Sequence, residues 1–124
     1  MLKHEELTFR IRAAATEVHR ELGPGLLEST YEECLCFELS QCGLAFKRQV
    51  SLPVTYKNIQ LDCGYRLDVV VQDKCVLELK AVDQMSNVFS AQLLTYMKLG
   101  HFPVGLLINF NVPLLKDGIK RFVL

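Results

Sequence analysis

Hydrophobic residues recur along the first forty positions with the period of an α-helix. Between residues 5 and 22 they form one stripe, so this segment is predicted to be an amphipathic helix that ends at Gly23-Pro24-Gly25. A second helix is predicted over residues 27–41, with Gly43 as its terminator. The two predicted buried faces consist of Leu7, Ile11, Ala14, Ala15, Val18 and Leu22, and of Tyr31, Leu35 and Leu39.

From residue 46 onward the hydrophobic period becomes that of β-strands. Pro53 indicates an edge strand or a bulge, and the polar residues 72–74 supply a turn between two strands. The order of elements, α-α-β-β-β-α-β-β, predicts an α/β fold with one mixed central sheet flanked by helices, in a single domain over residues 1–124. These later elements are strands at 46–56, 59–71 and 75–81, a helix at 88–99, an apolar strand at 102–109 and a short strand at 118–124.

Charged residues interrupt the two apolar strands that flank the turn at 72–74. If the turn is centred on Asp73, residues whose numbers sum to 146 lie opposite one another, so Asp68 faces Glu78 and Arg66 faces Lys80. Because side chains alternate along a strand, these four charged groups share one face. The opposite, apolar face then consists of Leu67, Val69, Val71, Cys75, Leu77 and Leu79.

Two carboxylates directly opposite each other repel unless water solvates them or a cation lies between them. Hard cations such as Mg²⁺ take oxygen ligands and often need only one or two protein carboxylates. Asp68, Glu78 and the backbone carbonyl of Leu79 would form such a site, beside which Lys80 could activate a water or offset charge on a phosphate. An ordinary hairpin with a solvated polar face, in which Lys80 pairs with a carboxylate, explains the same pattern.

Composition narrows the classes of function. Half of the 124 residues are hydrophobic, while 14 basic and 14 acidic residues cancel, so there is no general attraction to polyanions. Nucleic-acid binding would therefore need a local cluster or a bound cation. No signal peptide or membrane span is predicted, which indicates a soluble, cytoplasmic protein. The five irregularly spaced cysteines do not form a disulfide framework and are expected to be small buried thiols, with an iron–sulfur or zinc site as the alternative.

Three motifs occur in order along the chain. Asp68, followed after nine residues by Glu78-Leu79-Lys80, resembles the PD-(D/E)XK motif of nucleases. Residues 25–31 (GLLESTY) read GxxExxY, and residues 92–96 (QLLTY) read QxxxY, which is similar to the helical motif of RecB-type nucleases. The chain thus resembles the GxxExxY family of the PD-(D/E)XK nuclease superfamily.

The rest of the chain extends this resemblance, with one departure. GLLINF at 105–110 and GIKR at 118–121 resemble the ending of the family, whereas Leu67 stands where a proline usually precedes the first aspartate. That proline is often absent in the superfamily. The resemblance implies a restriction-endonuclease-like core.

The resemblance also implies roles for individual residues. Asp68 and Glu78 would bind a metal ion, Mg²⁺ or Mn²⁺, and Lys80 would be the catalytic lysine. Glu28, in the first turn of its helix, would add a further acidic group to the metal shell, directly or through water. A favourable interaction with the helix dipole is the alternative explanation for a first-turn acid.

Gln92 and Tyr96, four residues apart on one helical face, would contact substrate or support the lysine. They could instead be boundary residues of an amphipathic helix. Arg66 is a candidate phosphate contact, although isolated basic residues are usually solvated.

Two classes of function follow from these residues. The first is a divalent-metal-dependent nuclease that hydrolyses phosphodiester bonds of nucleic acid, with DNA favoured over RNA. The alternative is a non-catalytic module that binds nucleic acid or protein on a nuclease-like fold. Either could act as a homodimer or within a larger complex. An enzyme predicts that Asp68→Ala or Lys80→Ala abolishes cleavage while folding survives.

Overall fold

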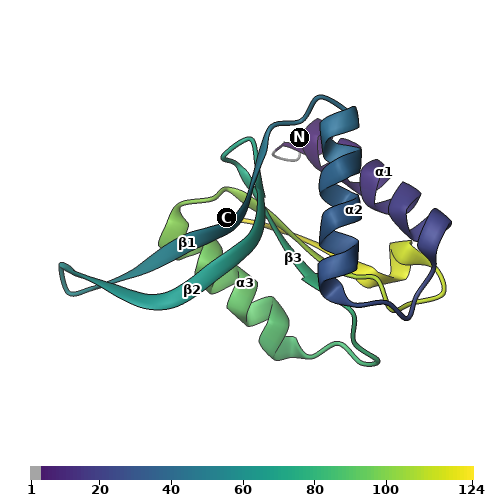
Figure 1. Cartoon of the computed structure of the whole chain (residues 1–124). Helices are drawn as coiled ribbons and strands as arrows, with labels where there is room; N and C mark the ends of the chain where they lie inside the picture. Colours follow the sequence, from purple (N-terminus) through teal and green to yellow (C-terminus); the bar gives the residue numbers. More distant parts are fainter. Residues whose placement is uncertain (1–3) are drawn as a thin grey trace.

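A five-stranded mixed sheet separates two layers of helices in the computed structural model, which describes residues 4–124. The strands lie in the order β1-β2-β3-β4-β5, and only β3 and β4 are parallel. Figure 1 shows α1 and α2 together on one side of the sheet and α3 on the other. The elements are α1 (Glu5–Leu22), α2 (Glu28–Gln41), β1 (Phe46–Tyr56), β2 (Ile59–Val71), β3 (Cys75–Lys80), α3 (Asn87–Gly100), β4 (Val104–Asn109), a 3-10 helix (Leu115–Gly118) and β5 (Ile119–Val123).

This architecture confirms the predicted α/β fold with a restriction-endonuclease-like core and the predicted order of helices and strands. The first three residues of the predicted 1–124 domain lie outside the described residues. The 3-10 helix before β5 was not predicted. No helix within residues 4–124 is both long and apolar enough to cross a membrane.

Helix α3 ends one residue later than the predicted helix at 88–99. Gly100 is still helical, and His101 adopts the left-handed conformation that closes the helix, with φ at 60°. Glycine is needed at position 100 for space instead, because a Cβ atom there would lie 2.4 Å from the Phe102 ring. At the other end, the Ser86 side chain caps α3 by accepting a hydrogen bond from the Val88 N–H at 3.1 Å.

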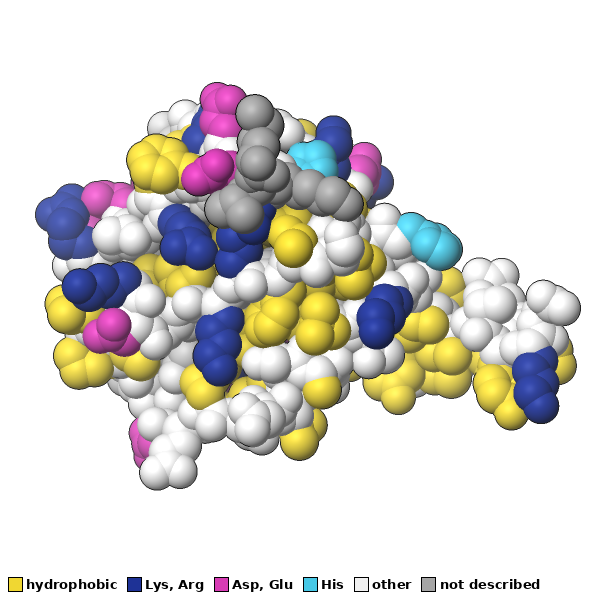
Figure 2. All heavy atoms as spheres, turned by 180° about the vertical axis from the view of Figure 1, so that it is seen from behind, with side chains coloured by type: hydrophobic (Ala, Val, Ile, Leu, Met, Phe, Trp, Pro, Cys, Tyr) yellow, Lys and Arg dark blue, Asp and Glu magenta, His cyan; other side chains and the backbone are white. Residues whose placement is uncertain are grey.

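Strands β1 and β2 form a long hairpin whose outer half projects from the body. The expectation for Pro53 is confirmed, because β1 is an edge strand and its register with β2 shifts between Leu52 and Val54. Ladder pairs between β2 and β3 begin only at Val69, so residues 52–65, the arm, have no third strand beside them. Figures 1 and 2 show this arm extending from the body in opposite views.

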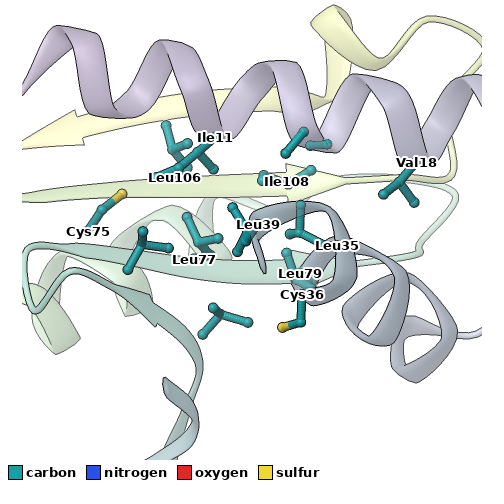
Figure 3. Close-up of a cluster of buried hydrophobic side chains, with 14 of the residues drawn as sticks. Ile11, Val18, Leu35, Cys36, Leu39, Cys75, Leu77, Leu79, Leu106 and Ile108 are labelled. Atoms are coloured by element: carbon teal, nitrogen blue, oxygen red, sulfur yellow. The ribbon is translucent and has the colours of Figure 1, made fainter. Parts of the chain in front are cut away.

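The larger hydrophobic cluster lies between the sheet and helices α1 and α2 (Figure 3). Alternate residues of β3, such as Leu77 and Leu79, enter this cluster, while Val76 faces α3 on the other side. Strand β4 is buried along its whole length, as its apolar sequence predicts. The sheet therefore has apolar packing on both faces.

Candidate active site at the open end of the β2–β3 hairpin

The turn end of the β2–β3 hairpin has the predicted register. Val69 pairs with Leu77, Val70 with Val76 and Val71 with Cys75, and each pair of numbers sums to 146. The connecting turn places Gln72 and Asp73 at φ values of 52° and 55°. Two successive residues with positive φ form the turn that suits the twist of a tight hairpin.

Beyond Val69 the ladder stops, and side chains replace backbone partners. The Leu79 N–H donates to Oδ2 of Asp68 at 2.9 Å, and the Asp68 N–H lies 3.4 Å from Oε1 of Glu78. The two predicted carboxylates are therefore brought together at the end where β2 and β3 separate. Lys80 follows at the end of β3.

Strand β2 is interrupted on its other side at the same point. The β1–β2 ladder passes from Arg48–Val69 to Val50–Leu67, with no pair at Asp68. Gln49, on β1, has a φ of 50°, which is uncommon for a residue other than glycine. Asp68 thus lies where both ladders of β2 are broken, and its carboxylate bonds along the plane of the sheet toward β3.

This interruption overturns two details of the predicted hairpin. Arg66 does not pair with Lys80, because the β2–β3 ladder ends before it and Arg66 pairs with Ser51 of β1 instead. Leu67 does not share the face of Val69, because it packs in the cluster on the α3 side. Successive side chains of β2 do not alternate strictly between the two faces of the sheet through Asp68, because the strand has no ladder pair on either side at that residue.

The acidic pair is partly removed from water. Glu78 is only 9% exposed and Asp68 is half-buried. Burial, and next the nearby Asp68 charge, raise the pKa of Glu78 to about 8. Burial also raises the pKa of Asp68, although the hydrogen bond from the Leu79 N–H acts in the opposite direction. In the absence of a cation, the pair therefore holds a proton at neutral pH.

Lys80 does not neutralise this pair by contact. No Lys, Arg or His nitrogen of the described chain lies within 4.0 Å of either carboxylate. The Lys80 Nζ instead lies 4.4 Å from the centre of the Phe89 ring, on the first turn of α3. Phe89 is not predictable from the sequence, because nothing local to α3 indicates which face meets β3.

Glu28 begins α2, as predicted, and is exposed. After burial and nearer groups, its charge makes a smaller contribution to the raised pKa of both Asp68 and Glu78. Nevertheless, residues 4–124 contain no group of three Asp, Glu, His or Cys side chains close enough to hold a metal ion. A cation at this site would therefore have the pair itself as its protein carboxylates, with Glu28 at longer range.

A second acid on α2, Glu32, is the main residue that the sequence analysis missed. It is buried and accepts hydrogen bonds from Arg48 Nε and Nη2 at 3.0 and 2.9 Å and from Gln49 Nε2 at 2.9 Å. This network ties α2 to β1 beside the break at Asp68. The available sequence signal was its spacing, one helical turn after Glu28.

Gln92 and Tyr96 lie on one face of α3 and touch each other, as their spacing predicts. Gln92 Nε2 donates to the Tyr96 hydroxyl at 2.8 Å. Tyr96 is buried, whereas Gln92 is exposed. Burial and then the Glu78 charge raise the pKa of Tyr96.

The oxygen atoms at the open end fit a hard divalent cation. In a strand, the N–H and C=O groups of one residue point to the same side. Since the Leu79 N–H bonds to Asp68, the Leu79 carbonyl also points toward β2, whereas the Lys80 carbonyl accepts from the Phe110 N–H near β4 at 2.9 Å. Two carboxylates and one carbonyl are an all-oxygen set of the kind that Mg²⁺ and Mn²⁺ prefer.

Comparison with known proteins gives one match. No curated protein and no solved structure matches the chain. A sequence model described as the PD-(D/E)XK nuclease superfamily matches residues 5–122, which include both helices before the sheet, the acidic hairpin and all of the last strand except Val123. The GxxExxY assignment stays a prediction. On this match and on the fold, the chain belongs to the PD-(D/E)XK nuclease superfamily.

Proposed function

We propose that this chain is a nuclease that depends on Mg²⁺ or Mn²⁺ and hydrolyses phosphodiester bonds of nucleic acid, with DNA as its substrate. One observation carries the proposal: Asp68 and Glu78 meet at a broken ladder, partly buried, and no basic side chain within residues 4–124 is in contact with them. A solvated surface hairpin does not require this arrangement. Two carboxylates held together out of water are stabilised by a cation between them.

In the proposed reaction, Asp68, Glu78 and the Leu79 carbonyl would hold the cation. When bound, such an ion lowers the pKa of water and offsets the charge of a phosphate. Lys80 lies beside the pair and is free of it, so its ammonium group can bind a phosphate oxygen and stabilise the charge that develops there. A water molecule attacks phosphorus and gives up a proton to solvent, while the bond to the leaving oxygen breaks and that oxygen takes up a proton.

The remaining residues would shape the approach of the substrate. Gln92 is exposed on the face of α3 that also carries Tyr96, so it is placed to contact a strand of nucleic acid. Arg66 is exposed on β2 and would contact phosphates further from the acids. Glu28 would act on the pair through its charge or through water.

The test is a cleavage assay with labelled DNA and RNA, single-stranded and duplex, in Mg²⁺ or Mn²⁺. We expect Asp68→Asn and Lys80→Met each to lower the cleavage rate by roughly a thousandfold, since each removes a charge that acts on the reacting phosphate. Asp117→Asn is the matched control, because Asp117 is exposed in the 3-10 helix.

Metal-dependent cleavage that survives in Asp117→Asn but is lost in the other two variants would support the nuclease. Cleavage that is unchanged in Asp68→Asn would contradict it, because a contaminating enzyme would then be responsible. If the protein cleaves none of these substrates and also binds no cation, the result would favour the non-catalytic module.

A further inference from the structure

A groove separates the arm from α3 on the side of the sheet that carries Tyr96. Its volume is about 470 Å³, within the range of roughly 300–1,000 Å³ typical of sites for small organic ligands. The arm contributes one wall and α3 contributes the other. The residues that matter here are Val54 and Tyr65 from the arm, and Val88, Gln92, Tyr96 and Leu99 from α3.

Two tyrosines define the floor and the accessible face of this groove. Tyr65 and Tyr96 have ring centres 5.7 Å apart with a tilt of 52°. Tyr96 is 8% exposed and forms a fixed base, whereas Tyr65 is 43% exposed and offers ring surface to a ligand. An aromatic face that is exposed beside apolar walls is suited to stacking on a flat, uncharged ring.

The charges around the groove indicate what kind of molecule fills it. None of the described residues that line it is charged, while Lys80 and the cation site lie at the ends of neighbouring strands. The protein as a whole is neutral, and Figure 2 shows basic side chains scattered over one face without a single large patch. Affinity for a nucleic acid therefore has to come from contacts other than many phosphate pairs.

From these features we propose that the groove binds a nucleobase of single-stranded nucleic acid, stacked on Tyr65, while the neighbouring phosphate lies at the acidic site. A polymer that alternates charged phosphates with neutral flat bases matches an acidic, cation-binding site beside an uncharged aromatic groove. Tyr96 connects the two, because it lines the groove and packs in one cluster with Val76, whose face of β3 Glu78 shares. This inference rests on the proposed nuclease function.

The groove selects for single strands. A base in a duplex is paired at its edge and stacked on both faces, so it reaches a side groove only after it is unpaired and unstacked. A base in a single strand is free to enter. DNA and RNA share this chemistry, and strands of both kinds with the same sequence distinguish them.

The experiment measures binding of fluorescent oligonucleotides by anisotropy, using the full chain in EDTA so that metal-dependent cleavage does not occur. We expect single strands to bind at least roughly tenfold more tightly than the duplex, and Tyr65→Ala to weaken single-strand binding by roughly tenfold. Tyr65→Phe should bind like the wild type, because it keeps the ring. Tyr56→Ala is the matched control, since Tyr56 is exposed on the arm but does not line the groove.

An abasic strand provides the decisive comparison. Its binding should be weak and equal in wild type and Tyr65→Ala, because it has no base to stack. Equal binding of duplex and single strand, or equal effects of Tyr65→Ala and Tyr56→Ala, would overturn the inference. If the protein cleaves nucleic acid but Tyr65→Ala leaves binding unchanged, only the groove proposal is wrong. If binding depends on Tyr65 but no cleavage occurs, only the nuclease proposal is wrong.

Discussion

At the turn end of the β2–β3 hairpin, three residue pairs form a regular ladder, and every side chain in it is buried and apolar. At the open end of the same two strands, the ladder is gone and Asp68 and Glu78 accept hydrogen bonds from backbone N–H groups. The first end is stabilised by packing on both faces. The second keeps two acids together at the cost of a regular sheet.

This difference indicates how one hairpin serves both the fold and the site. Paired strands satisfy their backbone groups with each other, so they leave none for a ligand. Where the strands separate, the carbonyl of Leu79 and both carboxylates become available on the β2 side. The buried turn end supplies the rigidity that the open end lacks.

Removing packing at the turn end should have the largest effect on stability. Leu77 is fully buried in the cluster under α1 and α2, so we expect Leu77→Ala to lower the free energy of unfolding by about 2–5 kcal/mol. Val123→Ala, at an exposed position of β5, should cost less than about 1 kcal/mol. Urea unfolding measures both. Similar losses of unfolding free energy in the two variants would contradict the claim that packing stabilises the turn end.

Proton binding at the open end should make stability depend on pH in the metal-free protein. Glu78 has a pKa of about 8 when folded and the ordinary value of 4.5 when unfolded. Between these values the folded state holds the extra proton, so the free energy of unfolding falls as pH rises, by at most about 1.4 kcal/mol per pH unit.

Glu78→Gln tests this dependence because the amide does not titrate. In EDTA, its free energy of unfolding should fall less steeply than that of the wild type between about pH 5 and pH 8. Unfolding curves at several pH values give the comparison. Parallel pH profiles would show that the buried acid has no raised pKa.

The ion pair beside the open end should matter more than an ion pair on the surface. Glu32 is buried, so Arg48→Met leaves a charge without its partner and should cost about 1–3 kcal/mol of unfolding free energy. Arg20→Met removes an exposed pair with Glu17 and should lower the free energy of unfolding much less. Equal effects, measured by thermal or urea unfolding, would contradict a bracing role for Glu32.

The smallest expected effect concerns the position of Lys80. In Phe89→Leu the ammonium loses the ring 4.4 Å away and becomes free to pair with the acids, where it competes with a cation. We expect cleavage and Mn²⁺ affinity to fall about threefold to tenfold, while Phe89→Tyr keeps both. Identical behaviour of the leucine and tyrosine variants would show that the ring does not hold the lysine.

Local pattern was sufficient to predict most of the fold. The stripe of apolar residues before Gly23 predicts α1, and β4 is recognisable as a continuous apolar run. The register of the β2–β3 hairpin also follows from sequence, since one polar turn at Asp73 determines which residues lie opposite.

The remaining features of the fold and the site depend on contacts between distant segments, and the hydrophobic period of the sequence carries no information about such contacts. The break at Asp68 involves Gln49 on another strand, so the new side taken by Leu67 and the pairing of Arg66 with Ser51 were not predictable. In the candidate site, the acids and Lys80 follow from a linear motif. Phe89 and Glu32 reach it only through the packing of α3 and α2 on the sheet.

Cation binding at the open end tests the central claim most directly. We would titrate Mn²⁺ by calorimetry at pH 8.5, above the pKa of Glu78 of about 8, into wild type, Asp68→Asn, Glu78→Gln and Asp117→Asn. We predict that Mn²⁺ binds to wild type and to Asp117→Asn, and that Asp68→Asn and Glu78→Gln each lose this binding. Absence of binding to the wild type, or equal binding to all four proteins, would contradict the claim that Asp68 and Glu78 form a cation site.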